Sequence, residues 1–105
     1  MTIIDTNALE PLERLPGWRG HIFHSANMTF AHWNFSAGAT IHGHQHEQEE
    51  VWHVVEGELE ITFGGETHVA GPGMVAIIPP HMAHEVKALT SGKAIVADFP
   101  LREGF

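Results

Sequence analysis

The chain has 105 residues, no cysteine and a formal net charge of −8, from thirteen acids against five bases. This length accommodates one domain. The absence of cysteine excludes disulfides, iron–sulfur clusters and thiol nucleophiles, and the acidic balance argues against binding to nucleic acid. No apolar run reaches the roughly 18 residues of a membrane helix, so we expect a soluble, cytoplasmic protein with no membrane partner. Ten histidines are the unusual feature of the composition.

Short strands dominate the elements that the sequence predicts. The single helical stretch, Thr6 to Leu12, is kept short by Pro11 and Pro16. After it, β-branched and aromatic runs that end at glycine, proline or serine predict strands. In chain order these strands cover residues 28–35, 51–55, 59–63, 66–69, 74–78, 86–89 and 93–99, with Gly64-Gly65 as a hairpin loop. Many short strands at regular spacing are typical of an antiparallel sandwich or barrel.

The strand pattern also suggests how the chain is organised. We expect one domain, made of an N-terminal segment (residues 1–27, with a strand) and a barrel (residues 28–105). A closed barrel removes the exposed edges that so many short strands would otherwise present. Because the core that fits into this length is modest, we expect the protein to form a homodimer.

The histidines cluster with glutamates in the region 42–53. In an extended chain, side chains two residues apart share a face, so His44 and His46 would point together, and Glu50 has the same parity. His84 follows a proline turn and could complete the set from another strand. Three imidazoles and one carboxylate suit a divalent transition metal, whereas magnesium and calcium prefer oxygen ligands.

Two segments resemble the sequence motifs of the cupin family. The first motif is matched at every spacing by Gly38-x5-His44-x-His46-x3-Glu50-x6-Gly57. The second is matched by Gly73-x5-Pro79-x-His81-x2-His84, with His81 where the family pattern has glycine and Ala88 where it has asparagine. The resemblance implies an all-β, single-domain cupin, a jelly-roll barrel of double-stranded β-helix topology. It also implies four metal ligands, which are His44, His46, Glu50 and His84.

This ligand set would hold one divalent transition metal ion, and it is compatible with manganese, iron, cobalt, nickel, copper or zinc. The site would also need a pocket for a small-molecule substrate. Trp52 and Gln48 share the parity of Glu50 and are expected in the pocket, and His81 is expected at its mouth because turn residues often line binding sites. Further apolar lining is expected from Ile77 and Met82.

The C-terminal segment carries a second resemblance. Phe99-Pro100-Leu101-Arg102-Glu103-Gly104-Phe105 is similar to the tail of small single-domain cupins, among them the pectin-degradation cupins that linearise unsaturated uronates. In that group a tail arginine binds the substrate carboxylate, which implies the same role for Arg102, since a guanidinium donates two parallel hydrogen bonds. The alternative is a surface arginine paired with Glu103 or solvent. Asp98 is a candidate acid or base in the same segment.

Three functions stay open at this point. The first is a metal-dependent enzyme that isomerises or opens the ring of a small oxygen-rich substrate such as a sugar acid. The second is a ferrous iron dioxygenase. The third is a module that binds a metal or small ligand without turnover. All three share the same fold and metal site, so the fold alone does not separate them.

Overall fold

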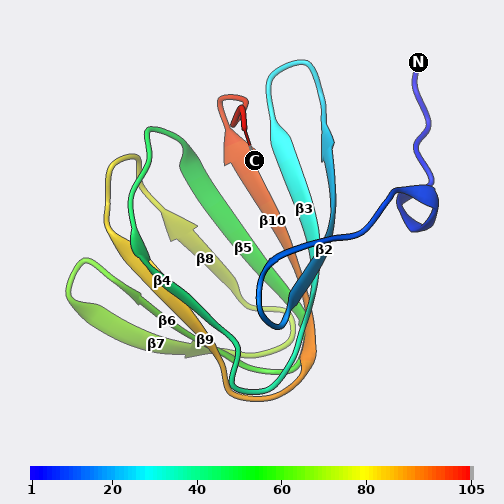
Figure 1. Cartoon of the computed structure of the whole chain (residues 1–105). Coiled ribbons are helices and arrows are strands. Elements are labelled where there is room, and N and C mark those ends of the chain that lie inside the picture. The colour runs from blue at the N-terminus through cyan, green and yellow to red at the C-terminus, as the bar shows by residue number, and fades with distance from the viewer. Residues whose placement is uncertain (105) are drawn as a thin grey trace.

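The computed structural model describes residues 1–104, and its strands form two antiparallel sheets that face each other as a jelly roll (Figure 1). The six-stranded sheet has, in spatial order, β1 (Leu12–Leu15), β2 (Trp18–His24), β3 (Thr29–Phe35), β10 (Gly92–Phe99), β5 (Glu49–Glu56) and β8 (Val75–Ile78). The four-stranded sheet has β4 (Thr40–His44), β9 (His84–Ala88), β6 (Leu59–Phe63) and β7 (Glu66–Ala70). The predicted all-β jelly roll is confirmed.

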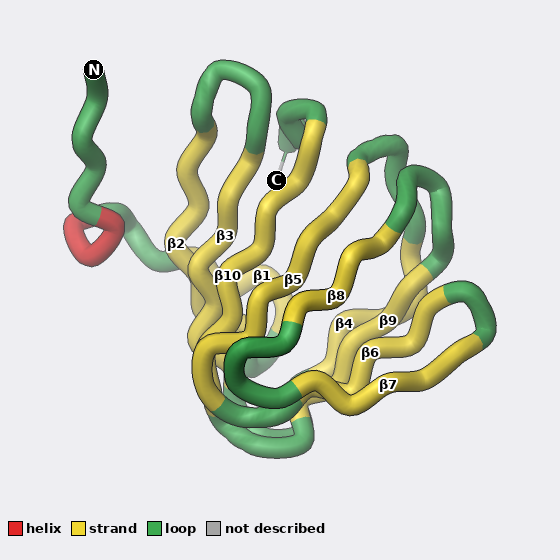
Figure 2. The backbone as a smooth tube through the Cα atoms, turned by 180° about the vertical axis from the view of Figure 1, so that it is seen from behind, coloured by secondary structure: helices red, strands yellow, loops and turns green. Residues whose placement is uncertain are grey.

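The N-terminal segment differs from its prediction. The expected helix from Thr6 to Leu12 is wrong, because only a short 3-10 helix forms at Thr6–Ala8, with the Asp5 side chain accepting a hydrogen bond from the Asn7 amide. The chain then enters β1, and both β1 and β2 belong to the six-stranded sheet. The residues before the 3-10 helix project away from the barrel (Figures 1 and 2). Within residues 1–104, no helix is long and apolar enough to cross a membrane.

Three strands, β1, β2 and β4, lie outside the seven predicted strand ranges, although one strand was expected within residues 1–27. Glycine interrupts the sequence pattern of β2 and β4. Gly20 in β2 lies against the indole of Trp33, and a Cβ atom at this position would come within 2.4 Å of that ring. Glycine is therefore required here by close packing, even though it weakens the propensity for a strand. Gly43 plays no such packing role, since a Cβ there would meet nothing within 4 Å.

The core lies between the inner faces of the two sheets. Along β5, Glu50, Trp52 and Val54 are buried, while Val51 and His53 point to the other face, as the period of two in a strand requires. In the four-stranded sheet, Leu59 and Ile61 of β6 are buried. The apolar core closes one part of the space between the sheets, and the polar side chains of the site occupy another.

Candidate metal centre

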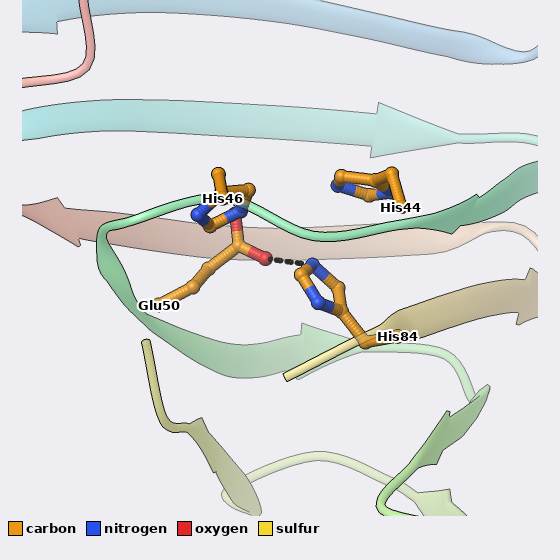
Figure 3. Close-up of side chains that lie close together, drawn as sticks. All are labelled: His44, His46, Glu50 and His84. Atoms are coloured by element: carbon orange, nitrogen blue, oxygen red, sulfur yellow. Dashed lines mark ion pairs between the residues drawn. The ribbon is translucent and has the colours of Figure 1, made fainter. Parts of the chain in front are cut away.

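The structure brings the four predicted ligands together (Figure 3). His44 ends β4, His46 lies in the following loop, Glu50 is in β5 and His84 begins β9. Each side chain offers a ligand atom, and these atoms all lie within 4.8 Å of one another. The histidines of β4 and β9 belong to the four-stranded sheet and the glutamate to the six-stranded sheet, so the cluster spans the space between the two sheets.

The parity argument for this cluster was wrong, although the grouping was right. The chain leaves β4 after His44 and turns before β5, so His46 and Glu50 do not share one extended run with His44. Two backbone features replace that run. His44 and His84 are direct partners in the register of β4 and β9, and the His81 amide donates a 2.7 Å hydrogen bond to the His46 carbonyl.

The three histidines are held in one tautomer. The Nδ1 atom of each lies within hydrogen-bond distance of a backbone carbonyl: His44 at 2.9 Å from His42, His46 at 3.1 Å from Gln48, and His84 at 2.9 Å from Met82. A carbonyl only accepts, so each Nδ1 carries the proton and each Nε2 keeps its lone pair. The Nε2 atoms of His46 and His84 are buried and face the Glu50 carboxylate, at 3.7 and 2.8 Å, without a hydrogen bond of good geometry in the described chain. Such orientation by backbone carbonyls is typical of histidines that ligate metals.

Glu50 supplies the negative charge of the cluster. Its side chain is buried, its Oε2 lies 2.8 Å from the His84 Nε2, and the Trp52 indole N–H donates a 3.0 Å hydrogen bond to the same oxygen. Burial alone would raise the pKa of Glu50, but the adjacent polar groups of His46, His84, Asp98 and Trp52 hold that pKa well below its usual range. The carboxylate is therefore ionised, as a metal ligand must be.

These observations fit a divalent transition metal ion. Three imidazole nitrogens with free lone pairs and one ionised carboxylate form a mixed nitrogen–oxygen set, which is the donor chemistry of such ions. Two buried nitrogen atoms whose lone pairs face a carboxylate are otherwise costly to keep in a folded protein, and a metal ion bound by them would remove that cost.

Asp98 and Arg102 lie next to the cluster. The Arg102 Nη1 atom is 3.6 Å from both Glu50 Oε1 and Asp98 Oδ2. Burial, and next the Glu50 carboxylate, raises the pKa of Asp98 to about 8. Thr29 fixes the tail, because its buried hydroxyl accepts a 2.8 Å hydrogen bond from the Arg102 amide. The two predicted catalytic residues thus adjoin the cluster, and Phe105, the last residue of the tail, lies outside the described residues.

A cavity of about 420 Å³ opens beside the cluster. All three tryptophans of the chain line it, and Trp18 contacts the other two edge-on, with its ring centroid 6.2 Å from Trp33 and 5.8 Å from Trp52. Two of the five basic residues, Arg14 and Arg102, also line it. The cavity therefore combines aromatic walls with two guanidinium groups, His44 and Glu50.

The predicted pocket residues lie in different places. Trp52 lines the cavity, but Gln48 and His81 do not. Gln48 is buried behind the site, where its side-chain amide donates a 3.3 Å hydrogen bond to the Leu101 carbonyl, and His81 is an exposed residue at positive φ. Ile77 was wrongly expected in the lining, because its parity places it on the outer face and it is 59% exposed. Met82 packs against the core.

Sequence reasoning missed much of the cavity wall. Arg14 and Trp18, for example, line it from β1 and β2. No motif marks them. The useful signal was composition, since a chain with three tryptophans and five bases has few other ways to bind a ring or an anion.

Comparison with known proteins agrees with this geometry. Residues 31–100 match the family described as a cupin domain. The chain belongs to the cupin family. This cupin is 32% identical over 73 residues to an uncharacterised protein of Streptomyces coelicolor, covering 70% of each chain. Among solved structures, it resembles an RmlC-like cupin of Shewanella frigidimarina (25% identity, TM-score 0.91, covering 98% of this chain and 94% of the other). It also resembles KdgF of a Halomonas species (26% identity, TM-score 0.89, covering 97% of each chain).

Proposed function

We propose that this cupin is a metal-dependent enzyme that opens or isomerises a small sugar acid. The observation that carries the proposal is that two of the ligands, His44 and Glu50, line one cavity together with Arg102, whose Nη1 atom is 3.6 Å from Glu50. A substrate carboxylate bound by Arg102 would therefore lie next to the metal ligands. The resemblance of the C-terminal tail to the pectin-degradation cupins supports the same substrate class.

In this proposal the residues in and around the cavity have separate roles in catalysis. Arg102 binds the carboxylate through charge-assisted hydrogen bonds, and the tryptophan walls exclude water and pack against the apolar face of a sugar ring. A divalent metal held by the four ligands would supply Lewis-acid polarisation of a substrate oxygen. Asp98, buried beside Arg102, holds or accepts a proton at its carboxyl oxygen.

Ring opening of a 4,5-unsaturated uronate needs no other reactant. The C1 hydroxyl loses a proton, the bond between C1 and the ring oxygen breaks, and C4 gains a proton as the C5 enol becomes a ketone. Atoms and charge balance within the substrate, so one group that moves a proton and one that fixes the carboxylate are sufficient. Asp98 and Arg102 fill these two roles.

The test is turnover of a 4,5-unsaturated uronate by metal-loaded protein, followed as loss of the absorbance of the conjugated double bond. We expect Arg102→Ala to lower kcat/KM by about 10- to 100-fold, which corresponds to loss of a charged hydrogen bond, with metal content unchanged. Arg19→Ala is the matched control, since Arg19 is an exposed arginine of β2 that does not line the cavity. Absence of turnover in metal-loaded wild type would refute the proposal.

Measurements on the same metal-loaded protein distinguish the two alternative functions. Oxygen consumption by the iron-loaded form with a catechol-like or thiol compound, and no change in the uronate, would indicate a dioxygenase. Retention of a small acid without turnover, reduced by Arg102→Ala, would indicate a binding module. Either result would leave the metal site intact and replace only the reaction assigned to it.

A further inference from the structure

Five residues of the described chain are buried although they are polar or charged. Three of them already have a role, because Glu50 and His84 belong to the metal centre and Asp98 is the acid or base of the proposed reaction. The other two, Thr29 and Gln48, are 1% and 6% exposed and do not line the cavity. Burying a polar side chain is costly unless it forms hydrogen bonds, so the partners of these two side chains indicate what they do.

Both side chains bind the same peptide unit, the one between Leu101 and Arg102. The Gln48 side-chain amide donates a 3.3 Å hydrogen bond to the Leu101 carbonyl. The Thr29 hydroxyl accepts a 2.8 Å hydrogen bond from the Arg102 amide, and the His24 Nδ1 atom lies 2.8 Å from that hydroxyl. Because the carbonyl and the amide of a trans peptide point in opposite directions within one plane, the two side chains hold this unit from opposite sides.

The strand ladder does not reach this peptide unit. The last register pairs of β10 join Asp98 to Thr29 of β3 and Phe99 to Glu49 of β5. Past the end of β10 the chain turns back on itself (Figure 1), and no ladder pair follows in residues 1–104. Asp98 is therefore held by the backbone of the sheet, whereas Arg102, three residues past the end of the strand, is held by side chains of the neighbouring elements.

Gln48 also contacts the metal centre. Its backbone carbonyl lies 3.1 Å from the His46 Nδ1 atom and accepts the proton of that ring. One residue thus orients a metal ligand through its backbone and the peptide unit of Arg102 through its side chain. Replacing the side chain leaves the carbonyl in place, so mutation can separate the two contacts.

We propose that Gln48 and Thr29 are positioning residues for Arg102. By fixing the peptide unit that precedes the Arg102 side chain, they keep its guanidinium at the cavity wall, 3.6 Å from Glu50. Their effect on substrate passes through Arg102 alone, and it rests on the proposed function, in which Arg102 binds the substrate carboxylate.

The first test is the replacement Gln48→Met, which removes the amide at nearly constant size. With metal-loaded protein and a 4,5-unsaturated uronate, we expect KM to rise about 3- to 10-fold, the effect of one neutral hydrogen bond. We expect unchanged kcat, because Asp98 stays in the ladder and uniform binding acts on KM, and unchanged metal affinity, because the Gln48 carbonyl remains. Gln45→Met is the matched control and should equal wild type, since Gln45 is an exposed glutamine of the same loop.

Thr29 provides an independent pair of variants. Thr29→Val removes the hydroxyl and keeps the branched shape, and it should raise KM as Gln48→Met does. Thr29→Ser keeps the hydroxyl and should restore a KM near that of wild type. Adding Gln48→Met to Arg102→Ala should cause no further loss of kcat/KM, because two changes that act through one group are not additive.

Hydrogen exchange of the Arg102 amide, followed by NMR, tests the positioning without substrate. Exchange reports local opening of the segment, and we expect it to be about 3- to 10-fold faster in Gln48→Met and Thr29→Val, as for loss of one hydrogen bond. Gln45→Met should exchange as wild type. Should wild type fail to convert the uronate while this difference is observed, the proposed function would be refuted and the positioning of Arg102 would stand.

Two kinds of result would overturn the proposal, in variants whose fold is checked by circular dichroism. One is an Arg102 amide that exchanges, or a KM in an active enzyme that remains, as in wild type in both Gln48→Met and Thr29→Val. The other is weaker metal binding in Gln48→Met, or a further loss of kcat/KM when it is added to Arg102→Ala. Either of these would mean that the Gln48 side chain acts on the metal centre instead of on Arg102.

Discussion

The two sheets of this cupin differ in the residues that they place on their inner and outer sides. The four-stranded sheet has a charged outer side and contributes His44 and His84 to the site at its inner side. The six-stranded sheet contributes the carboxylates Glu50 and Asp98 at its inner side, and the outward residues across its middle, such as Ile95, Val51 and His53, are not Asp, Glu, Lys or Arg. Nitrogen ligands thus come from one sheet and its adjoining loop, and the oxygen ligand comes from the other.

This difference indicates what a bound metal does for the fold. Because its ligands are divided between the sheets, a metal ion would tie the sheets together at the end of the barrel where the core is polar. The apolar part of the core joins them elsewhere.

The largest effect is expected on metal affinity. His84→Ala removes a buried ligand of β9 and should weaken binding of zinc or cobalt more than 100-fold, because loss of a supporting contact alone costs about 10- to 100-fold. His68→Ala, at an exposed position of β7 in the same sheet, should leave affinity unchanged. Titration calorimetry measures both. Equal affinities for the two variants would show that β9 supplies no ligand.

Metal removal should destabilise the whole barrel. At a free metal concentration of about 100 times Kd, binding adds about 2.7 kcal/mol to the free energy of unfolding. For a domain of this size, that corresponds to a Tm change on the order of 10 to 20 °C. Thermal unfolding with and without chelator measures it, and His84→Ala should show no chelator effect. An unchanged Tm in wild type would mean that no metal links the sheets.

Neighbouring valines of β5 should distinguish the two sides of the six-stranded sheet. Val54 is 0% exposed and Val55 is 41% exposed. Val54→Ala should lower the free energy of unfolding by about 2 kcal/mol through lost burial and a cavity. Val55→Ala should change it by less than about 0.5 kcal/mol. Urea unfolding compares them, and similar losses would contradict the assigned register of β5.

The smallest effect is expected on the titration of His32, on the outer side of the six-stranded sheet. Burial, and next the charge of His21, lowers the pKa of His32 from its usual value of 6.5. As pH falls through 6.5, the unfolded chain therefore takes up this proton before the folded one, and the folded state loses stability. NMR titration should give a pKa below 6.5 for His32 and a higher value in His21→Gln. A normal pKa in wild type would contradict the burial of this ring.

The fold and the ligand set could be predicted because both depend on patterns between residues that are close in the sequence. Glycine and proline turns delimit most strands, and the spacing of His44, His46 and Glu50 is local. Other features depend on tertiary contacts. Gly20 suits β2 only because Trp33 lies over it, and Arg14 reaches the cavity only because β1 joins the six-stranded sheet.

Two of the pocket residues were misplaced for a related reason. Parity along one extended chain put Gln48 in the pocket, but the turn between β4 and β5 rotates its side chain toward the C-terminal tail. Proximity in sequence to His84 suggested His81, but its left-handed backbone at φ 65° leaves the side chain exposed. Parity holds within a strand and fails across the turn that ends it.

The central claim is that His44, His46, Glu50 and His84 form one transition-metal centre. X-ray absorption spectroscopy of the cobalt- or zinc-loaded protein tests it most directly. We predict a first shell of nitrogen and oxygen at about 2.0 to 2.2 Å that includes three imidazoles in wild type and two in His84→Ala. A wild-type spectrum with fewer than three imidazoles, or one unchanged in His84→Ala, would contradict the claim.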